Sequence, residues 1–261
     1  MIEIKNLCKS FEGHTVLSNI NAVFENGKTN LIIGRSGSGK TVLMKTIVGL
    51  LTPEKGEVLY DGRNLVRMNK NEKTTLRREM GMIFQSAALF DSMTVLENVM
   101  FPLDMFSKDN YQERMKRALF CLDRVNLIGA EKKYPGEISG GMQKRVAIAR
   151  AIALNPQYLF CDEPNSGLDP KTSLLIDELI HDITTEYNIT TIINTHDMNS
   201  VTGIGDSILF INEGHLEWHG TKKEVFNSGC QTFDDFVFAS ELLRMAKRAE
   251  IESHKHTTNA R

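Results

Sequence analysis

The chain has 261 residues, of which 41% are hydrophobic and 25% are charged, as in an ordinary globular protein. This length allows one large α/β domain, or one such domain with an inserted subdomain, but not two full domains of that kind. The net charge of −2 argues against a dominant nucleic-acid-binding face, so we expect no nucleic-acid partner.

The N-terminus and the cysteines indicate a protein that stays in the cytosol. The first residues, "MIEIKNLCKSF", alternate charged and apolar side chains, which predicts a first strand and not a signal peptide. No stretch reaches the roughly 18 to 20 uninterrupted apolar residues that cross a bilayer, so any membrane role requires a partner. The four cysteines lack the spacing of metal ligands, a pattern typical of reduced thiols.

Three short apolar runs that end in glycine or polar residues predict buried strands. Helical patterns follow the first run and separate the other two. Buried strands that alternate with helices indicate a parallel sheet, in which ligands lie at the carboxyl ends of the strands. Gly34, Glu163 and His196 fall at such ends. The runs are residues 29–34, 158–163 and 190–196, and the helical patterns are residues 40–51 and 171–187.

The strand signal disappears between Ser86 and Tyr134. Within this stretch, residues 110–128 have the periodicity of an amphipathic helix. We therefore expect a helical subdomain over about residues 86–154, inserted into a domain that spans residues 1–231.

A hairpin, an amphipathic segment and a polar tail are predicted toward the C-terminus. The hairpin covers "DSILFINEGHLEWHG" and turns at residues 212–214, because Asn and Gly tolerate the positive φ of tight turns. The amphipathic segment, from Thr232 to Ala249, either packs on its own domain or contacts another subunit. We expect the polar residues 251–261 to be disordered. Residues 232–261 are thus expected to form a C-terminal helix and tail.

The stretch "GRSGSGKT", residues 34–41, matches the pattern G-x-x-x-x-G-K-[ST] between a predicted strand and a predicted helix. Glycines let the backbone wrap around phosphates, Lys40 reaches the β- and γ-phosphate oxygens, and the Thr41 hydroxyl ligates Mg²⁺. A flexible Gly/Ser turn is the alternative. The context of strand and helix favours a phosphate loop.

Two acidic residues close the second apolar run. Asp162 stands where a phosphate-loop ATPase carries its metal-associated carboxylate, and Glu163 follows directly. Consecutive strand residues point to opposite sides, so we expect Asp162 to face Mg²⁺ and Glu163 to face the attacking water as general base. Taken alone, such a pair is more often a solvated turn.

His196 and Gln85 follow two further strand patterns. The His196 imidazole could hydrogen-bond the γ-phosphate or orient the water, although a lone histidine is usually structural. Gln85 ends "MGMIF", where its amide could ligate the metal or sense the γ-phosphate at the boundary with the helical subdomain.

A second glycine turn, "ISGGMQ", opens a helical pattern at residues 138–143. Backbone N–H groups at a helix start attract anions. This turn adds the Ser139 hydroxyl but has no lysine, so it is better suited to completing a phosphate site than to founding one. The alternative is a glycine pair that only permits close helix packing.

These motifs, in this order along nearly the whole chain, resemble those of the ATP-binding subunits of ABC transporters. The resemblance implies an α/β fold: a P-loop parallel-sheet core, an N-terminal antiparallel β subdomain and the inserted helical subdomain. It makes residues 34–41 the Walker A loop, "YLFCDE" the Walker B strand, "ISGGMQ" the signature and "SGLD" the D-loop. Gln85 becomes the Q-loop glutamine and His196 the switch histidine.

The resemblance also implies ATP and Mg²⁺ as ligands and ATP hydrolysis coupled to transport. Two copies would pack head to tail, so that the signature of one covers the γ-phosphate held by the other. Catalysis is assigned to Glu163 and His196, and the metal to Thr41, Gln85 and Asp162. The residues expected to bind the nucleotide are Phe11, which would stack on adenine, Gly34, Arg35, Ser36, Gly37, Ser38, Gly39, Lys40, Thr41, Gln85, Ser139, Gly140, Gly141 and Asp169.

Two positions depart from the pattern of the family. Asn165 stands where threonine usually follows "DEP", and the signature reads GGMQ where many members have GGQ. Neither position supplies a phosphate ligand, so we expect catalysis to survive.

The run "FQSAALFDSMTVLENVMFPL" narrows the resemblance to one group of ABC transporter ATPases. Its Met, Phe and Leu residues form either plain core or a groove for a helix of a membrane partner. With "SGGMQKRVAIARAIALNP" and "THDM", this run is most similar to the ATPases of MCE-type (Mla-like) systems, which move phospholipids between bacterial envelope membranes. That likeness implies an integral permease, an MCE-domain lipid-binding protein and a place on the cytoplasmic face of the cell membrane.

Two other functions stay open at this point. The chain could power transport of another cargo, such as a lipoprotein, an amino acid or a metal complex. A soluble ABC protein acting on ribosomes or DNA is the third alternative. It predicts tandem ATPase domains, coiled-coil heptads or a basic arm, and this sequence has none of them.

Overall fold

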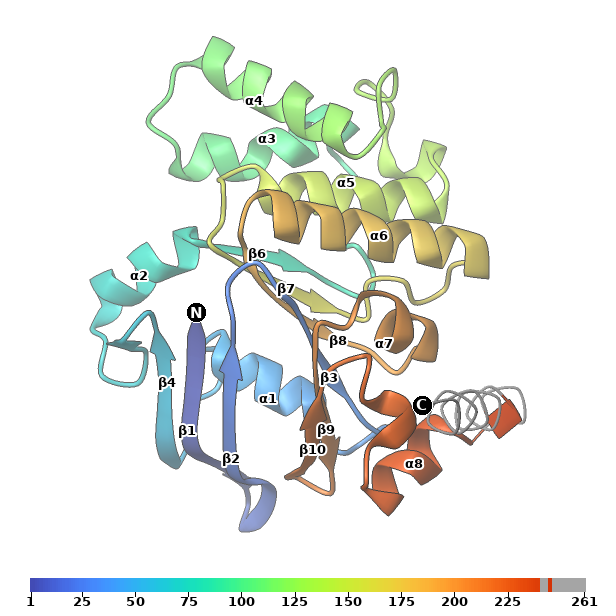
Figure 1. The fold of residues 1–261 in the computed structure, drawn as a ribbon. Helices are drawn as coiled ribbons and strands as arrows, with labels where there is room; N and C mark the ends of the chain where they lie inside the picture. The colour runs from blue at the N-terminus through green and yellow to red at the C-terminus, as the bar shows by residue number, and fades with distance from the viewer. Residues whose placement is uncertain (240–243, 246–261) are drawn as a thin grey trace, which may run out of the picture.

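The computed structural model describes residues 1–239 and 244–245, whose strands form two sheets (Figure 1). The smaller sheet is antiparallel and is the N-terminal β subdomain that the family resemblance implies. It consists of β1 (Ile2–Phe11), β2 (His14–Phe24), β4 (Lys55–Tyr60) and β5 (Arg63–Asn64), in the spatial order β2-β1-β4-β5.

The larger sheet carries the strands predicted from the sequence. It consists of β3 (Thr29–Ile33), β6 (Met80–Ile83), β7 (Tyr158–Asp162), β8 (Thr190–Asn194), β9 (Ser207–Asn212) and β10 (His215–Gly220). The spatial order is β10-β9-β3-β8-β7-β6, and all neighbours are parallel except β9 and β10. Because β3, β8 and β7 are adjacent and parallel, their carboxyl ends meet at one edge of the sheet, as predicted.

The larger sheet is buried on both faces. In β3, Leu31 and Ile33 pack into the core formed with the helices, whereas Ile32 packs into the core shared with the antiparallel sheet. Successive side chains of a strand point to opposite faces, so a strand covered on both sides needs apolar residues at successive positions. This requirement explains the continuous apolar runs in the sequence.

Helices cover the larger sheet from both sides. The helix α1 (Lys40–Ile47) packs in the core between the two sheets, and α6 (Pro170–Glu186) and α7 (Met198–Ile204) pack on the opposite face. The helix α2 (Lys70–Arg78) lies beside the antiparallel sheet (Figure 1). Among the described residues, no helix combines the length and apolar character that crossing a bilayer demands.

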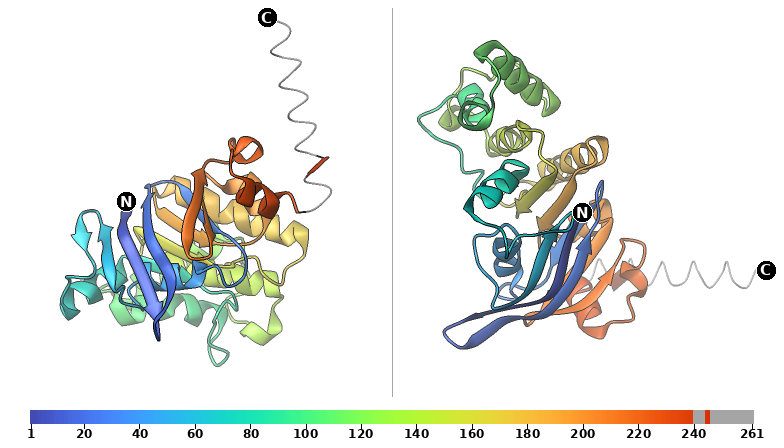
Figure 2. Two further views of the ribbon diagram at one scale, coloured as in Figure 1. Left: turned by 90° about the horizontal axis from the view of Figure 1, so that it is seen from below. Right: turned by 90° about the vertical axis from the view of Figure 1, so that its left-hand side faces the viewer.

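The helical subdomain forms a further layer beyond α6 (Figures 1 and 2). It contains α3 (Val95–Phe106), α4 (Tyr111–Arg124), a short 3-10 helix (Pro135–Glu137) and α5 (Gly140–Ile152), all within residues 86–154. Capping boxes fix the starts of α3 and α4, since the N-cap side chain and the glutamate three residues later exchange hydrogen bonds with the backbone.

Two predicted helices end earlier than their apolar patterns indicate. The first stops at Ile47 because Gly49 takes a left-handed conformation, with φ of 76°. The helix within residues 110–128 stops at Arg124, and Asn126 is left-handed with φ of 54°. In both cases the apolar residues continue past the helix, so periodicity alone could not place its end.

The hairpin is formed by β9 and β10 as predicted, but positive φ occurs at Glu213 and Gly214, and Asn212 is the last residue of β9. A 3-10 turn (Val225–Asn227) leads to α8 (Gln231–Val237). Phe233 of α8 stacks on Trp218 of β10, with ring centroids 4.0 Å apart. The described start of the predicted segment 232–249 therefore packs on its own domain, while most of its remainder and the predicted tail 251–261 lie outside the described residues.

Candidate functional site

The phosphate loop joins β3 to α1 and needs its glycines for space. A Cβ atom on Gly34 would lie 2.1 Å from the Ile211 carbonyl oxygen, and one on Gly39 would lie 2.8 Å from Cδ2 of Leu17. Both glycines also have positive φ. The loop is thus held against β2 and the β9–β10 hairpin in a form that larger residues cannot adopt.

Lys40 is buried at the start of α1 and closes this loop. Its ammonium group donates to the carbonyl oxygens of Gly34 at 2.7 Å and Arg35 at 3.0 Å. Burial lowers the pKa of Lys40, and the nearby carboxylates of Glu163 and Asp162 counteract that shift. The Lys40 side chain is therefore held among acceptors inside the loop.

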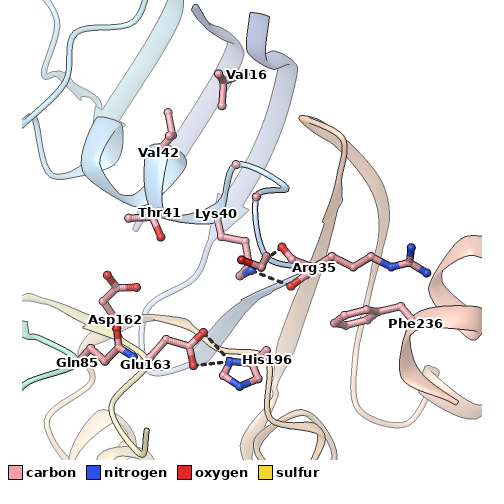
Figure 3. Close-up of a pocket in the computed structure, with 14 residues that line it drawn as sticks. Val16, Arg35, Lys40, Thr41, Val42, Gln85, Asp162, Glu163, His196 and Phe236 are labelled. Atoms are coloured by element: carbon pink, nitrogen blue, oxygen red, sulfur yellow. Dashed lines mark hydrogen bonds and ion pairs between the residues drawn. The ribbon is translucent and has the colours of Figure 1, made fainter. Parts of the chain in front are cut away.

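The loop opens onto a cavity of about 670 Å³ that brings most of the predicted residues together (Figure 3). Three further residues that the sequence reasoning missed, Val16, Val42 and Phe236, also line it. The predicted residues that line it are Gly34, Arg35, Ser36, Gly37, Gly39, Lys40, Thr41, Gln85, Asp162, Glu163 and His196.

Asp162 is the last residue of β7 and Glu163 follows the strand, and their side chains point in different directions. Figure 3 shows Asp162 on the side of Thr41 and Glu163 directed at His196. An Asp162 oxygen accepts from the Asn194 side-chain amide at 3.1 Å, and the Glu163 N–H donates to the Asn194 carbonyl oxygen at 3.0 Å. Asn194, the last residue of β8, therefore aligns both acidic residues.

Glu163 and His196 are in contact. Nδ1 of His196 lies 2.9 Å from one Glu163 carboxylate oxygen and 2.8 Å from the other. The Glu163 side chain is 17% exposed and that of His196 is 69% exposed. Glu163 also has a positive φ of 49°, an unfavourable conformation for a residue with a Cβ atom. The histidine thus holds a carboxylate that is largely withdrawn from water.

Gln85 connects the cavity to the helical subdomain. The Gln85 side-chain amide donates to the Ser166 hydroxyl at 3.1 Å. The backbone carbonyl oxygen of Gln85 accepts a hydrogen bond from the Lys144 ammonium of α5. Lys144 is buried, and burial lowers its pKa while Glu163 counteracts this. Lys144 was not among the residues predicted from the sequence. It lies three residues after Gly141 and four before Ile148, a spacing that places it on the buried face of the helix and could have indicated its role.

The predicted signature and D-loop residues lie outside the cavity. The Ser139 hydroxyl caps α5 by accepting from the Met142 N–H at 3.3 Å, and Asp169 caps α6. Gly140 is exposed, whereas a Cβ atom on Gly141 would lie 2.7 Å from Cγ2 of Thr172. Close helix packing thus explains Gly141 but not Gly140.

Phe11 also lies outside the cavity, at the end of β1. Its side chain is 42% exposed, and the Lys9 ammonium lies 4.9 Å from its ring centroid. Stacking of Phe11 on adenine stays a prediction.

The residues at the cavity fit a nucleotide phosphate chain with one Mg²⁺ ion. Ser38, also predicted to bind the nucleotide, does not line the cavity, and its buried hydroxyl has no hydrogen-bond partner among the described residues. The described residues contain no cluster of three or more acidic, histidine or cysteine side chains that could hold a metal. Mg²⁺ is usually bound by one or two protein oxygens plus phosphates, and Thr41, Asp162 and Gln85 supply such oxygens.

Comparison with known proteins identifies relatives over most of the chain. The ABC transporter family matches residues 17–166. The "Probable ribonucleotide transport ATP-binding protein mkl" of Mycobacterium leprae is 38% identical, covering 87% of this chain and 65% of its own length. The "Methionine import ATP-binding protein MetN" of Carboxydothermus hydrogenoformans is 41% identical, covering 87% and 68%. The "Intermembrane phospholipid transport system ATP-binding protein MlaF" of Haemophilus influenzae is 38% identical, covering 87% and 86%.

A solved structure shares the fold. The ATP-binding cassette MJ0796, determined as a dimer in a post-hydrolysis state with ADP and Pi, superposes with a TM-score of 0.77 at 34% identity. The superposition covers 85% of this chain and 99% of that one. The chain described here is a member of the ABC transporter family, with the fold of its ATP-binding cassettes.

Proposed function

We propose that this chain is the ATP-hydrolysing subunit of a membrane transporter. The observation that carries the proposal is the meeting of Lys40, Asp162 and Glu163 at one cavity beneath a glycine-rich loop. A lysine, the backbone N–H groups of a glycine-rich loop and oxygen ligands for a metal together match a nucleoside triphosphate with Mg²⁺. When bound, Mg²⁺ would neutralise charge that develops on the phosphate oxygens.

Binding is assigned to the loop and its neighbours. Lys40 donates to carbonyl oxygens of the loop in this structure, and charged phosphate oxygens are stronger acceptors for the same ammonium. Thr41, Asp162 and Gln85 would hold the metal. The cavity between the loop and these oxygens is large enough for the phosphates.

The chemical step is assigned to Glu163. As general base, its carboxylate accepts a proton from the water that attacks the γ-phosphorus, so that the nucleophile becomes hydroxide-like as the bond to ADP breaks. His196 is assigned to orient Glu163 through the observed contact. A direct hydrogen bond from His196 to the γ-phosphate stays a prediction.

A second copy of the chain would complete the site. Ser139 and Gly140 are exposed and lie outside the cavity of their own chain, so they are free to cover a phosphate held by another chain. The similar cassette MJ0796 was determined as a dimer, which supports the involvement of a second copy. We infer a head-to-tail dimer in which each ATP contacts Lys40 of one copy and the signature turn of the other.

Phospholipid is the cargo that we propose, moved through an integral permease together with an MCE-domain protein. The names of the three relatives point to three different cargoes, so names alone do not decide. The alignment spans 86% of the phospholipid-transport relative but only 65% and 68% of the other two. This chain therefore matches the size of the former most closely. The subunit would lie on the cytoplasmic face of the membrane.

Substitution of the general base tests the enzymatic proposal. Glu163→Gln should retain ATP binding, lower hydrolysis at least about 100-fold, and trap an ATP-bound dimer. ATP affinity, turnover and particle mass measure these effects. Glu186→Gln changes an exposed glutamate that pairs with Arg124, and it should leave all three unchanged. Wild-type turnover by Glu163→Gln would remove Glu163 from its assigned role.

Purification of the chain from native membranes tests the cargo. Recovery of an MCE-domain protein and phospholipid with the permease is the expected result. A periplasmic solute-binding protein in their place would overturn the lipid assignment.

A further inference from the structure

Three buried polar side chains form a cluster behind the catalytic edge of the sheet. They are Asn165, which is 6% exposed, Asp177, which is 2% exposed, and Ser200, which is 1% exposed. Each belongs to a different element: the loop after β7, the helix α6 and the helix α7. Polar groups are costly to bury unless they are hydrogen-bonded, so the arrangement of their bonds matters.

The Asp177 carboxylate is the centre of this cluster. The Asn165 side-chain amide donates to both carboxylate oxygens at 3.2 Å and lies 3.2 Å from the Ser200 hydroxyl. The Ser200 hydroxyl donates to the same carboxylate at 2.6 Å. Asp177 therefore binds the loop and α7 to α6 at one point.

Two of the three elements joined by Asp177 adjoin the proposed catalytic groups: the loop after β7 contains Glu163, and α7 begins two residues after His196. Asn165 stands two residues after Glu163, and Ser200 stands four residues after His196. Asp177 lies on the helix that begins at the D-loop residue Asp169. The contact between Glu163 and His196 is thus formed by two segments that are tied together behind it.

We propose that Asn165, Asp177 and Ser200 are positioning residues that hold the loop containing Glu163 and the helix α7, which follows His196, in register for hydrolysis. None of the three touches the cavity, so each acts through Glu163 or His196. This inference rests on the proposed function of Glu163. It also gives Asn165, the residue that departs from the family pattern, a defined task.

The directions of the hydrogen bonds make the proposal testable. In Asp177→Asn, one carboxylate acceptor becomes an N–H donor that faces the Asn165 amide, so donors oppose each other in a buried site. The exchange variant Asn165→Asp with Asp177→Asn places the acceptor on the loop and the donor on α6. It restores a matched pair, and Ser200 can still donate to the relocated carboxylate.

The turnover number kcat and the ATP affinity of the full-length dimer are the quantities to measure. Asp177→Asn should lower kcat by about tenfold or more and change ATP affinity less than about twofold, because small misplacements of catalytic groups are costly. The exchange variant should return kcat to within about threefold of the wild type. Ser200→Ala, which removes one hydrogen bond, is the milder variant if Asp177→Asn does not fold.

A matched control separates positioning from stability. Thr184 lies on the same helix and makes a buried hydrogen bond to Thr191 at 2.6 Å. Thr184→Val should lower the melting temperature but not kcat. Wild-type kcat in Asp177→Asn or Ser200→Ala, a loss of kcat shared equally by Thr184→Val, or failure of the exchange variant to recover would each overturn the proposal.

Glu163→Gln, assayed in parallel, distinguishes the two proposals. If it is inactive while Asp177→Asn and Ser200→Ala are unaffected, only the positioning role fails. If Glu163→Gln turns over normally, the catalytic assignment fails first, and the positioning role that rests on it is overturned with it.

Discussion

Two adjacent glycines in the signature turn have different surroundings despite their identical chemistry. Gly141 faces Thr172 so closely that a methyl group would clash at 2.7 Å, and so it permits α5 to pack on α6. Gly140 is exposed, with no atom nearer than 3.8 Å to an added Cβ. Packing therefore does not explain why a glycine is needed at position 140. Close approach of a nucleotide phosphate bound by a second copy would explain it.

Alanine substitution separates these two roles. Gly141→Ala should lower the melting temperature, and the added change Thr172→Ser, which removes the clashing methyl group, should restore it. Gly140→Ala should leave stability unchanged or raise it by up to about 1 kcal/mol, since alanine favours helix, but lower ATP turnover by the dimer. Unchanged turnover in Gly140→Ala would argue against contact with the nucleotide.

The buried negative charge of Asp177 lowers the stability of the folded protein. Burial raises its pKa to about 6, and the negative charges of Asp197 on α7 and Glu178 on α6 act in the same direction. The hydrogen bonds from Ser200 and Asn165 oppose this rise in pKa. The buried Cys161 thiol of β7 faces the Asp177 carboxylate. Because this pKa lies above the usual 3.8, the folded protein binds the proton more tightly than the unfolded chain does.

The stability of the wild type relative to Asp177→Asn should therefore depend on pH. As the pH falls from about 6 to about 4, the wild type should gain up to about 3 kcal/mol relative to the variant, because protonation removes the cost of the buried charge. Denaturant unfolding of both proteins between pH 4 and 7 measures the difference. A stability difference that does not change with pH would mean that burial does not raise the pKa of Asp177.

The helix α5 connects the signature turn to the segment that begins at Gln85. Besides Lys144, which donates to the Gln85 carbonyl oxygen, Arg150 donates to the carbonyl oxygens of Ala87 and Ala88 at 2.8 Å each. Both alanines have positive φ. Two cations of one helix thus hold a strained segment between the cavity and the helical subdomain, so α5 and Gln85 should move as a unit.

Hydrogen exchange tests this connection. Lys144→Met should speed exchange of the amides in residues 85–88, because the segment loses one of its two anchors, while α1 stays protected. Lys116→Met replaces an exposed lysine of the same subdomain and should change neither region. Equal protection of residues 85–88 in both variants would show that Arg150 alone holds the segment.

Elements whose signals are local could be predicted from the sequence, whereas those that depend on distant partners could not. The phosphate loop and the hairpin turn each occupy a few consecutive residues whose backbone requirements are specific. The polar helix α2 was missed by apolar periodicity, although its capping box of Asn69 and Glu72 was readable. Lys144 hydrogen-bonds Gln85, which is 59 positions away, and Asn165 hydrogen-bonds Ser200, which is 35 positions away. Only the folded structure brings such distant residues together.

On the scale of the whole molecule, the two parts of the proposed phosphate site do not meet within one chain. The cavity lies at the carboxyl edge of the larger sheet, and the signature turn begins α5 of the helical subdomain, a separate layer (Figures 1 and 2). A site divided in this way would make hydrolysis depend on the approach of a second copy. That dependence would allow ATP binding to close a dimer and so move an attached permease.

The central claim, that each active site is shared between two copies, predicts complementation between inactive variants. Lys40→Ala disables the phosphate loop, and Ser139→Glu sets a negative charge against the phosphate, so each variant alone should hydrolyse almost no ATP. A mixed dimer contains one site with both defects and one site with neither. ATP hydrolysis should therefore return when the two variants are mixed, and a mixture no more active than either variant alone would contradict the claim.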